Sequence, residues 1–425
     1  MKLYQVACLF NSDKSQFAPG ALVVEEGKIL ALGDLEAMKQ DYSQAEVVDY
    51  SNSALLPGIV DAHTDLSLSL KDFSKTKFQE AYHGDYRFIP WVVEISRYKA
   101  KLEVTHQRQA VSLGLEQAQD LGVTTLGDVC RYPVAISQYE NSPLNIVALA
   151  EVENIQRPQA QEDFEQALAL ADEVESKAHP RLHPGLAPFS AYTLSKHLLK
   201  LLADHAFHQQ WPFHLQASLS FAELEFFYDS MGEIPAILFK EAGWSDKIPP
   251  PHRMTPLAFL KEIGFLQKGP SLIGALHLGP SDQEILESLK LLRIFSPQAF
   301  INLNLAQLDW PKLYQEKAPW AWASLGRAWG GNTNPWQEMA SILQVFPDEE
   351  KEAVAWWLLE SFTLQGARAL ALDQQLGLLK KSYSADFVLL PAPTKGTLSS
   401  LIQEQKPLQA VYVGGEKVFR KSQDN

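Results

Sequence analysis

The sequence has little cysteine and no long apolar run. Only two cysteines, Cys8 and Cys130, occur in 425 residues, which excludes a disulfide framework and fits a reducing compartment. No apolar stretch is long enough to cross a bilayer, and the N-terminus lacks the sustained apolar core of a secretory signal. We therefore expect a cytoplasmic protein that does not use a membrane.

Several catalytic signatures are also missing. The sequence has no C-x-x-C pair, no Walker loop, no G-x-G-x-x-G motif and no G-x-S-x-G nucleophile elbow. Positive charge is in deficit, because 37 Lys and Arg residues stand against 51 Asp and Glu residues, for a formal net charge of −14. An acidic surface of this kind repels phosphate backbones and disfavours nucleic-acid binding.

What is present is the composition and rhythm of a folded α/β protein, with 46% hydrophobic and 21% charged residues. Short β-type runs lie at both ends, around tight-turn dipeptides at Glu26-Gly27 and Gly414-Gly415. Between them, strand-like runs alternate with helical segments over about 300 residues, the size of a (β/α)8 barrel. We expect a TIM-like barrel over residues 58–365 and a small β-sandwich built from residues 1–57 and 366–425.

Four motifs give the chain a family resemblance. The run from Leu55 to Leu66, Leu-Leu-Pro-Gly-Ile-Val-Asp-Ala-His-Thr-Asp-Leu, resembles the opening strand of the amidohydrolase superfamily, in its aminohydrolase and chlorohydrolase branch. The segments 122–128, 186–195 and 385–389 resemble later family motifs in the same order. Glu223-Leu-Glu-Phe-Phe, with the segment 255–266, favours the aminofutalosine-deaminase-like subgroup. The resemblance implies a (β/α)8 barrel over nearly the whole chain.

The resemblance also implies a metal-dependent hydrolase. In this family one divalent metal, Zn or Fe, is held by two His on strand one, a His on strand five, a His on strand six and an Asp on strand eight, and it activates water as hydroxide. A Glu three residues after the strand-five His shuttles protons. The matching positions here are His63 and Asp65 on strand one, Gln216 and the proton-shuttle position Leu219 on strand five, Gly274 on strand six and Ala328 on strand eight.

Only His63 is the same residue type as the family ligand at its position, although the Asp65 carboxylate can still coordinate a metal ion. Because a catalytic zinc needs three good protein ligands, we expect no metal and no cofactor, and we interpret the chain as a pseudoenzyme with a degenerate metal site. It would act by binding a small-molecule ligand, or as a homodimer or hetero-oligomer with an active relative. The alternative is a metal-dependent C–N hydrolase or deaminase of a purine-like or other N-heterocyclic molecule, with a rebuilt Zn or Fe site.

Other residues near the vacated site are ligand-pocket candidates. Two histidines, His214 and His277, are either satisfied core histidines or members of a shifted metal site. Arg327 either pairs with Asp65, replacing the metal electrostatically, or points to solvent. Two aromatic residues, Phe189 and Trp329, either fill the old pocket, together with Leu219, or line a binding cavity.

Overall fold

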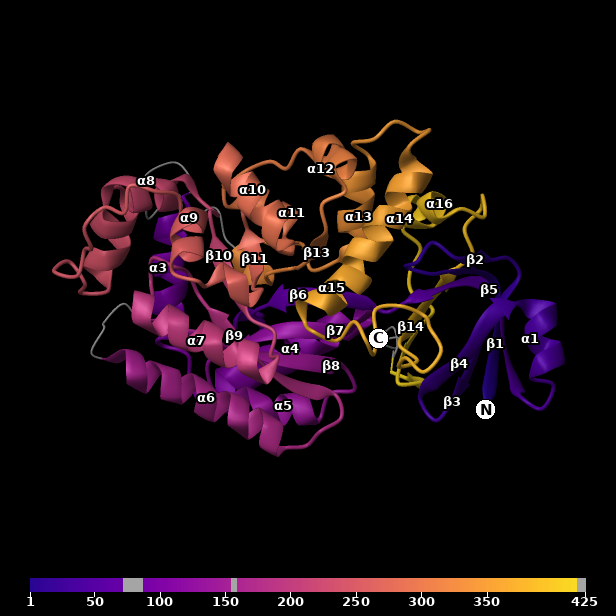
Figure 1. Cartoon of the computed structure of the whole chain (residues 1–425). Coiled ribbons are helices and arrows are strands. Elements are labelled where there is room, and N and C mark those ends of the chain that lie inside the picture. The colour runs from indigo at the N-terminus through magenta and orange to yellow at the C-terminus, as the bar shows by residue number, and fades with distance from the viewer. Residues whose placement is uncertain (72–86, 154–158, 419–425) are drawn as a thin grey trace.

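The computed structural model describes residues 1–71, 87–153 and 159–418. Both ends of the chain pair in one sheet, so the indigo and yellow segments lie side by side in Figure 1. Its strands are ordered β16-β15-β14-β5-β1-β3-β4, with β2 paired to β1. They are β1 (Lys2–Phe10), β2 (Gln16–Phe17), β3 (Gly20–Glu25), β4 (Lys28–Asp34), β5 (Glu46–Pro57), β14 (Phe387–Pro391), β15 (Ala410–Val413) and β16 (Glu416–Lys417).

Both predicted turns form hairpins in this sheet. Glu26 and Gly27 adopt φ angles of 49° and 77° between the antiparallel strands β3 and β4. Gly414 and Gly415 adopt φ angles of 56° and 73° between β15 and β16. Positive φ at both central residues matches the right-handed twist of a two-residue hairpin.

Two four-stranded parallel sheets make up the barrel wall. They meet through parallel bridges from Leu186 to Phe213 and from Ser190 to Gln216. At the other seam, the Leu325 amide donates to the His63 carbonyl over 3.0 Å, so the ring closes. The strands are β6 (Ile59–Thr64), β7 (Val123–Cys130), β8 (Asn145–Val152) and β9 (Leu182–Pro188), then β10 (His214–Ala217), β11 (Ser271–Gly274), β12 (Arg293–Phe295) and β13 (Trp320–Trp322).

Helices cover the outside of the barrel (Figure 1). Several begin with side-chain caps that the sequence supplies; for example, Ser195 accepts from the Leu198 amide at the start of α7. After β6 to β9 come α3 (Phe88–Lys99), α4 (Val104–Asp120), α5 (Ile136–Glu140), α6 (Ala160–Ser176) and α7 (Lys196–Gln209). After β10 to β12 come α8 (Phe221–Asp229), α9 (Pro256–Glu262), α10 (Pro280–Leu289), α11 (Pro297–Asn302) and α12 (Trp310–Glu316).

The remaining helices connect the barrel to the terminal sheet or flank that sheet. The structure also has short helical turns, of which η4 is π-helical and the others are 3₁₀. After β13 come α13 (Pro335–Leu343), α14 (Lys351–Phe362) and α15 (Leu364–Ala369), and the sheet carries α1 (Leu35–Asp41) and α16 (Leu398–Glu404). The single turns are η1 (Leu66–Leu68), η2 (Pro133–Ala135), η4 (Ile234–Phe239), η5 (Leu266–Lys268) and η6 (Arg327–Trp329).

The expected fold is confirmed: a parallel (β/α)8 barrel carries a β-rich domain made from both termini. Every residue of β6 and β7 is buried, as parallel strands covered on both faces should be. No helix in the described part of the chain is long and apolar enough to span a membrane. Since the strands run in parallel, their carboxyl ends gather at one mouth of the barrel, where barrel enzymes place their active sites.

Candidate functional site

Two histidines meet inside the barrel mouth. Nδ1 of His63, on β6, lies 3.1 Å from Nδ1 of His214, on β10. Nε2 of His214 lies 2.8 Å from the Ala369 carbonyl, which can only accept, so this nitrogen carries the proton. His214 Nδ1 is then an acceptor, and His63 Nδ1 donates to it. His214 therefore belongs to the site, one layer below the family's ligand position.

Both imidazoles are neutral at physiological pH. Burial lowers the pKa of His214 to about 4. The pKa of His63 falls well below its ordinary value because of burial first, then His214 and the charge of Lys99. A neutral imidazole pair joined by one hydrogen bond gives the site no charge of its own.

A lysine supplies the positive charge at the mouth. Lys99, the last residue of α3, places Nζ 2.7 Å from Asp65 Oδ2 and 3.0 Å from Glu151 Oε1, and all three side chains are buried. Burial alone would lower the pKa of Lys99, but the two carboxylates outweigh it and hold that pKa above its ordinary value. Glu151 also pairs with Arg131 Nε at 3.1 Å. Lys99 is therefore a cation held in an ion pair with Asp65, the residue at the position of a histidine ligand in the family that the sequence resembles.

The sequence prediction for Asp65 named a different partner. Pairing with Arg327 was one of two alternatives for that residue; the structure pairs Asp65 with Lys99, and Arg327 lies in η6. The physical reason is the path of α3, which crosses the barrel mouth: Trp91 of α3 donates from Nε1 to the Ala328 carbonyl over 2.9 Å. No motif marks Lys99, so only the tertiary packing reveals it.

Gly274, at the position that the resemblance assigns to the strand-six ligand, lies against Leu219, at the position of the proton-shuttle Glu. Gly274 has a φ of +94°, and a Cβ added there would lie 2.6 Å from Leu219 Cδ1. Leu219 is buried, as is Ala328 at the strand-eight position. The Leu219 side chain thus occupies the space that a side chain at residue 274 would need.

Two aromatic candidates pack at the mouth. The ring of Trp329 lies 6.5 Å from those of Phe189 and Phe88, measured between centroids, and all three are buried. Behind them, Asp61 accepts from the Ser324 amide at 2.9 Å, so it ties β6 to the segment after β13. Aromatic side chains therefore pack against one another at the barrel mouth.

Four polar atoms near the mouth are buried without a hydrogen-bond partner in the described part of the chain. They are Gln216 Oε1, Ser218 Oγ, Glu223 Oε1 and His277 Nε2. The His277 amide donates to the Ser218 carbonyl at 3.1 Å, and the Leu219 amide donates to Glu223 Oε2 at 2.9 Å, so these residues are close along β10 and its loop. Buried polar atoms normally have partners, so this group is a candidate ligand surface.

Sequence reasoning missed Ser218 and Glu223 as members of this group. The signal for Glu223 was the Ser-x-x-Glu spacing from Ser220, which predicts a helix N-terminus. The structure shows that cap, with the Glu223 amide 3.3 Å from Ser220 Oγ. Burial raises the pKa of Glu223 to about 8, so its carboxyl is protonated near pH 7 and its free oxygen can donate a hydrogen.

The described residues do not fit the metal that the family implies. Within them, no three His, Cys, Asp or Glu side chains lie close enough together to hold a metal ion. Asp65 is already engaged by Lys99 and by Ser67 Oγ at 2.6 Å. A second cation beside the Lys99 ammonium would be repelled, and a catalytic zinc takes three protein ligands.

Comparisons with known proteins show which proteins the chain is similar to. No family model matches the chain. Aminodeoxyfutalosine deaminase of Deinococcus radiodurans is 24% identical over 345 residues, which cover 78% of this chain and 77% of that protein. The structure of Helicobacter pylori aminofutalosine deaminase in complex with methylthio-coformycin superimposes with a TM-score of 0.83 at 19% identity, over 99% of this chain and all of that one.

A second structure, a zinc-bound adenosine deaminase from Xanthomonas campestris, gives a TM-score of 0.76 at 18% identity over 98% of this chain and 92% of that one. The similarity runs through the barrel and the terminal sheet together. The order of motifs along the sequence and the barrel that they build agree with it. The chain is thus similar in sequence to an aminodeoxyfutalosine deaminase, and its fold is the one that the solved aminofutalosine and adenosine deaminases share.

Proposed function

We propose that this protein binds a small polar ligand at the barrel mouth and does not carry out the metal-dependent hydrolysis of its superfamily. The carrying observation is the ion pair of Lys99 with Asp65, which puts a fixed ammonium on the carboxylate that a metal would need. The contact of Leu219 with Gly274 supports it, because it removes the acid–base position and the strand-six ligand position together.

The ligand chemistry follows from the unpartnered atoms. Glu223 offers a hydroxyl donor when protonated, Gln216 offers a carbonyl acceptor, and Ser218 offers either role. Leaving each such atom unmatched in the interior costs about 1–3 kcal/mol, so a ligand or water that pairs with them is favoured. A planar N-heterocycle with alternating donors and acceptors, such as a purine nucleoside, has this chemistry, and the named relatives act on molecules of this class.

The deciding experiment measures metal and turnover on the same preparation. Untagged protein, expressed with added zinc, iron and manganese, is analysed by elemental mass spectrometry and is then incubated with adenosine while ammonia is followed. We expect less than about 0.1 metal per chain, no ammonia, and a calorimetric binding signal for adenosine. Stoichiometric metal together with ammonia release would refute the proposal.

A second candidate function is a metal-dependent deaminase with a rebuilt site. The relatives favour it, since those named above are deaminases, and the two imidazole Nδ1 atoms of His63 and His214 lie 3.1 Å apart. Zn or Fe would then recruit Gln216 or His277 as further ligands. His63→Ala separates the two candidates: it abolishes metal and activity together in a deaminase, whereas in a binding protein it changes only stability or ligand affinity.

Partner binding is a further part of the proposal. A homodimer, or a hetero-oligomer with an active relative, would give a non-hydrolytic barrel a role through its surface. Light scattering on the purified chain, alone and mixed with an active relative, measures both. A monomer that forms no mixed species would leave ligand binding as the proposed role.

A further inference from the structure

A separate cavity of about 410 Å³ lies where the barrel meets the terminal sheet. Its wall includes Trp320, the first residue of β13, so it sits toward the amino ends of the strands, away from the barrel mouth. Lys14, from the loop between β1 and β2, reaches it from the terminal sheet. Both parts of the fold therefore contribute to this cavity, and none of its lining residues belongs to the site described above.

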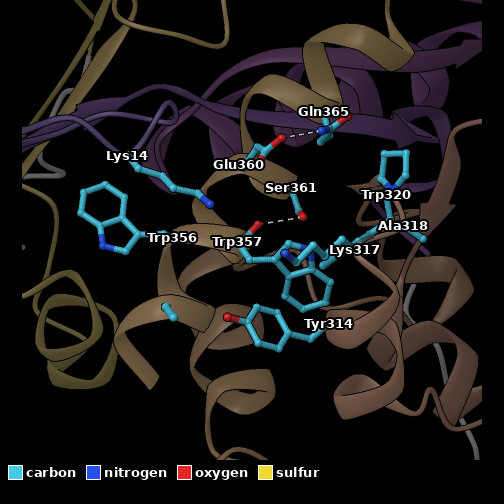
Figure 2. A pocket seen from close by; sticks show the side chains of 12 residues that line it. Lys14, Tyr314, Lys317, Ala318, Trp320, Trp356, Trp357, Glu360, Ser361 and Gln365 are labelled. Carbon is cyan, nitrogen blue, oxygen red and sulfur yellow. Dashed lines mark hydrogen bonds between the residues drawn. The ribbon is translucent and has the colours of Figure 1, made fainter. Parts of the chain in front are cut away.

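The wall is aromatic. Figure 2 shows Tyr314, Trp356 and Trp357 around the opening, with Lys14 extending toward the space between them and Glu360. The Trp357 ring packs edge-on at 5.5 Å from Tyr314 and 5.6 Å from Trp320. These rings are held by one another, so the cavity offers preformed aromatic surface to a planar ligand.

Two polar atoms of the lining residues are buried and have no partner in the described part of the chain. They are Gln365 Oε1 and Trp320 Nε1, on side chains that are 5% and 1% exposed. The other end of the Gln365 amide is fixed, because Nε2 donates to Glu360 Oε1 over 2.7 Å. Both atoms lie beneath the cavity wall, so a ligand meets the ring faces and the charged groups of the lining rather than these two atoms.

The rim carries net positive charge. Lys14 and Lys317 line the cavity against one carboxylate, Glu360, and neither lysine forms an ion pair with any described residue. The Lys14 loop is held in place, because Ser12 Oγ lies 2.6 Å from Thr363 Oγ1, at the junction of α14 and α15. A cation on an anchored loop loses little freedom when it meets an anion.

We propose that this cavity binds a compact aromatic anion, of the class of aryl or indolyl carboxylates. The rings stack on the ligand's aromatic face, and the two lysines neutralise its carboxylate. The volume matches the lower range of small-molecule sites. This binding is independent of the ligand proposed at the barrel mouth.

The test compares two probes of equal shape, indole-3-acetate and its neutral analogue indole-3-acetamide, by isothermal titration calorimetry on the full chain. We expect saturable binding of the carboxylate, at least fivefold tighter than that of the amide. Lys14→Gln and Lys317→Gln each weaken carboxylate binding about two- to fivefold, the size expected of partly exposed charge pairs, and leave amide binding unchanged. Lys312→Gln, on α12 outside the cavity, is the matched control for net charge.

Three results overturn the proposal. One is the absence of saturable carboxylate binding at millimolar concentration. The second is equal affinity for the acid and the amide, and the third is an equal loss in Lys312→Gln. The variant Glu223→Gln, at the barrel mouth, should leave indole-3-acetate binding unchanged. A loss of affinity in this variant would show that indole-3-acetate binds at the barrel mouth instead of in the cavity.

Discussion

Replacing Lys99 by methionine removes the ammonium from the barrel mouth and keeps an unbranched side chain of similar length. Among the described residues, the carboxylate of Asp65, which is 4% exposed, then keeps the hydrogen bond from the Ser67 hydroxyl, whereas Glu151 still pairs with Arg131. At an effective dielectric constant of about 20, opposite charges at the observed 2.7 Å attract by about 6 kcal/mol before desolvation is subtracted. Breaking a buried pair from one side costs about 3–5 kcal/mol, and we expect a loss of this size in the free energy of unfolding at pH 7.

The assay is urea unfolding followed by tryptophan fluorescence, with Lys101→Met as the control. Lys101 is exposed just beyond the same helix, so its replacement should change stability by less than about 0.5 kcal/mol. Adding Asp65→Asn to Lys99→Met removes the uncompensated charge and should restore part of the loss. A coupling energy below about 0.5 kcal/mol in this double-mutant cycle would refute the assignment of Lys99 as the cation that holds the mouth together.

Three further predictions concern the same region. Burial raises the pKa of Glu223 from the ordinary 4.5 to about 8, so between these pH values the native state binds a proton that the unfolded state has lost, and the free energy of unfolding falls as pH rises. The stability of Glu223→Gln relative to the parent protein should therefore rise by about 1.4 kcal/mol per pH unit over this range. Urea titrations from pH 5 to 8 that show no such trend would contradict a buried neutral carboxyl. Gly274→Ala should destabilise the fold by about 1–3 kcal/mol because its Cβ meets Leu219, and Leu219→Ala in the same chain should relieve part of that loss in thermal unfolding. His214→Phe should lower stability through loss of the Ala369 and His63 hydrogen bonds, without changing metal content measured by elemental analysis; a fall in bound metal would instead support the deaminase candidate.

Much of the site's framework could be predicted from short sequence patterns. The run ending at His63 and Asp65 marks the first barrel strand, and alternation of strand and helix predicts the barrel around it. Parity along β10 predicts that His214 shares a strand face with Gln216, and in the structure His214 Nδ1 lies 3.1 Å from His63 Nδ1. These inferences depend on periodicity and on order along the chain, which a sequence carries directly.

The partner of Asp65 could not be predicted in this way. The ion pair of Asp65 with Lys99 depends on where α3 ends relative to β6, and no sequence motif predicts that position. The same holds for Leu219 and Gly274, which are distant in sequence and lie against each other because β10 and β11 are adjacent in parallel register.

The sequence by itself determined the fold class and the motifs that carry the family resemblance, because these follow from local pattern. The tertiary structure decided which side chains meet at the barrel mouth: an ammonium on Asp65, a leucine against Gly274 and a neutral imidazole pair. Each of these depends on distances of a few ångströms between segments remote in the chain. Burial then sets their charge states, since removal from water shifts the pKa of each group according to the neighbours that the fold provides.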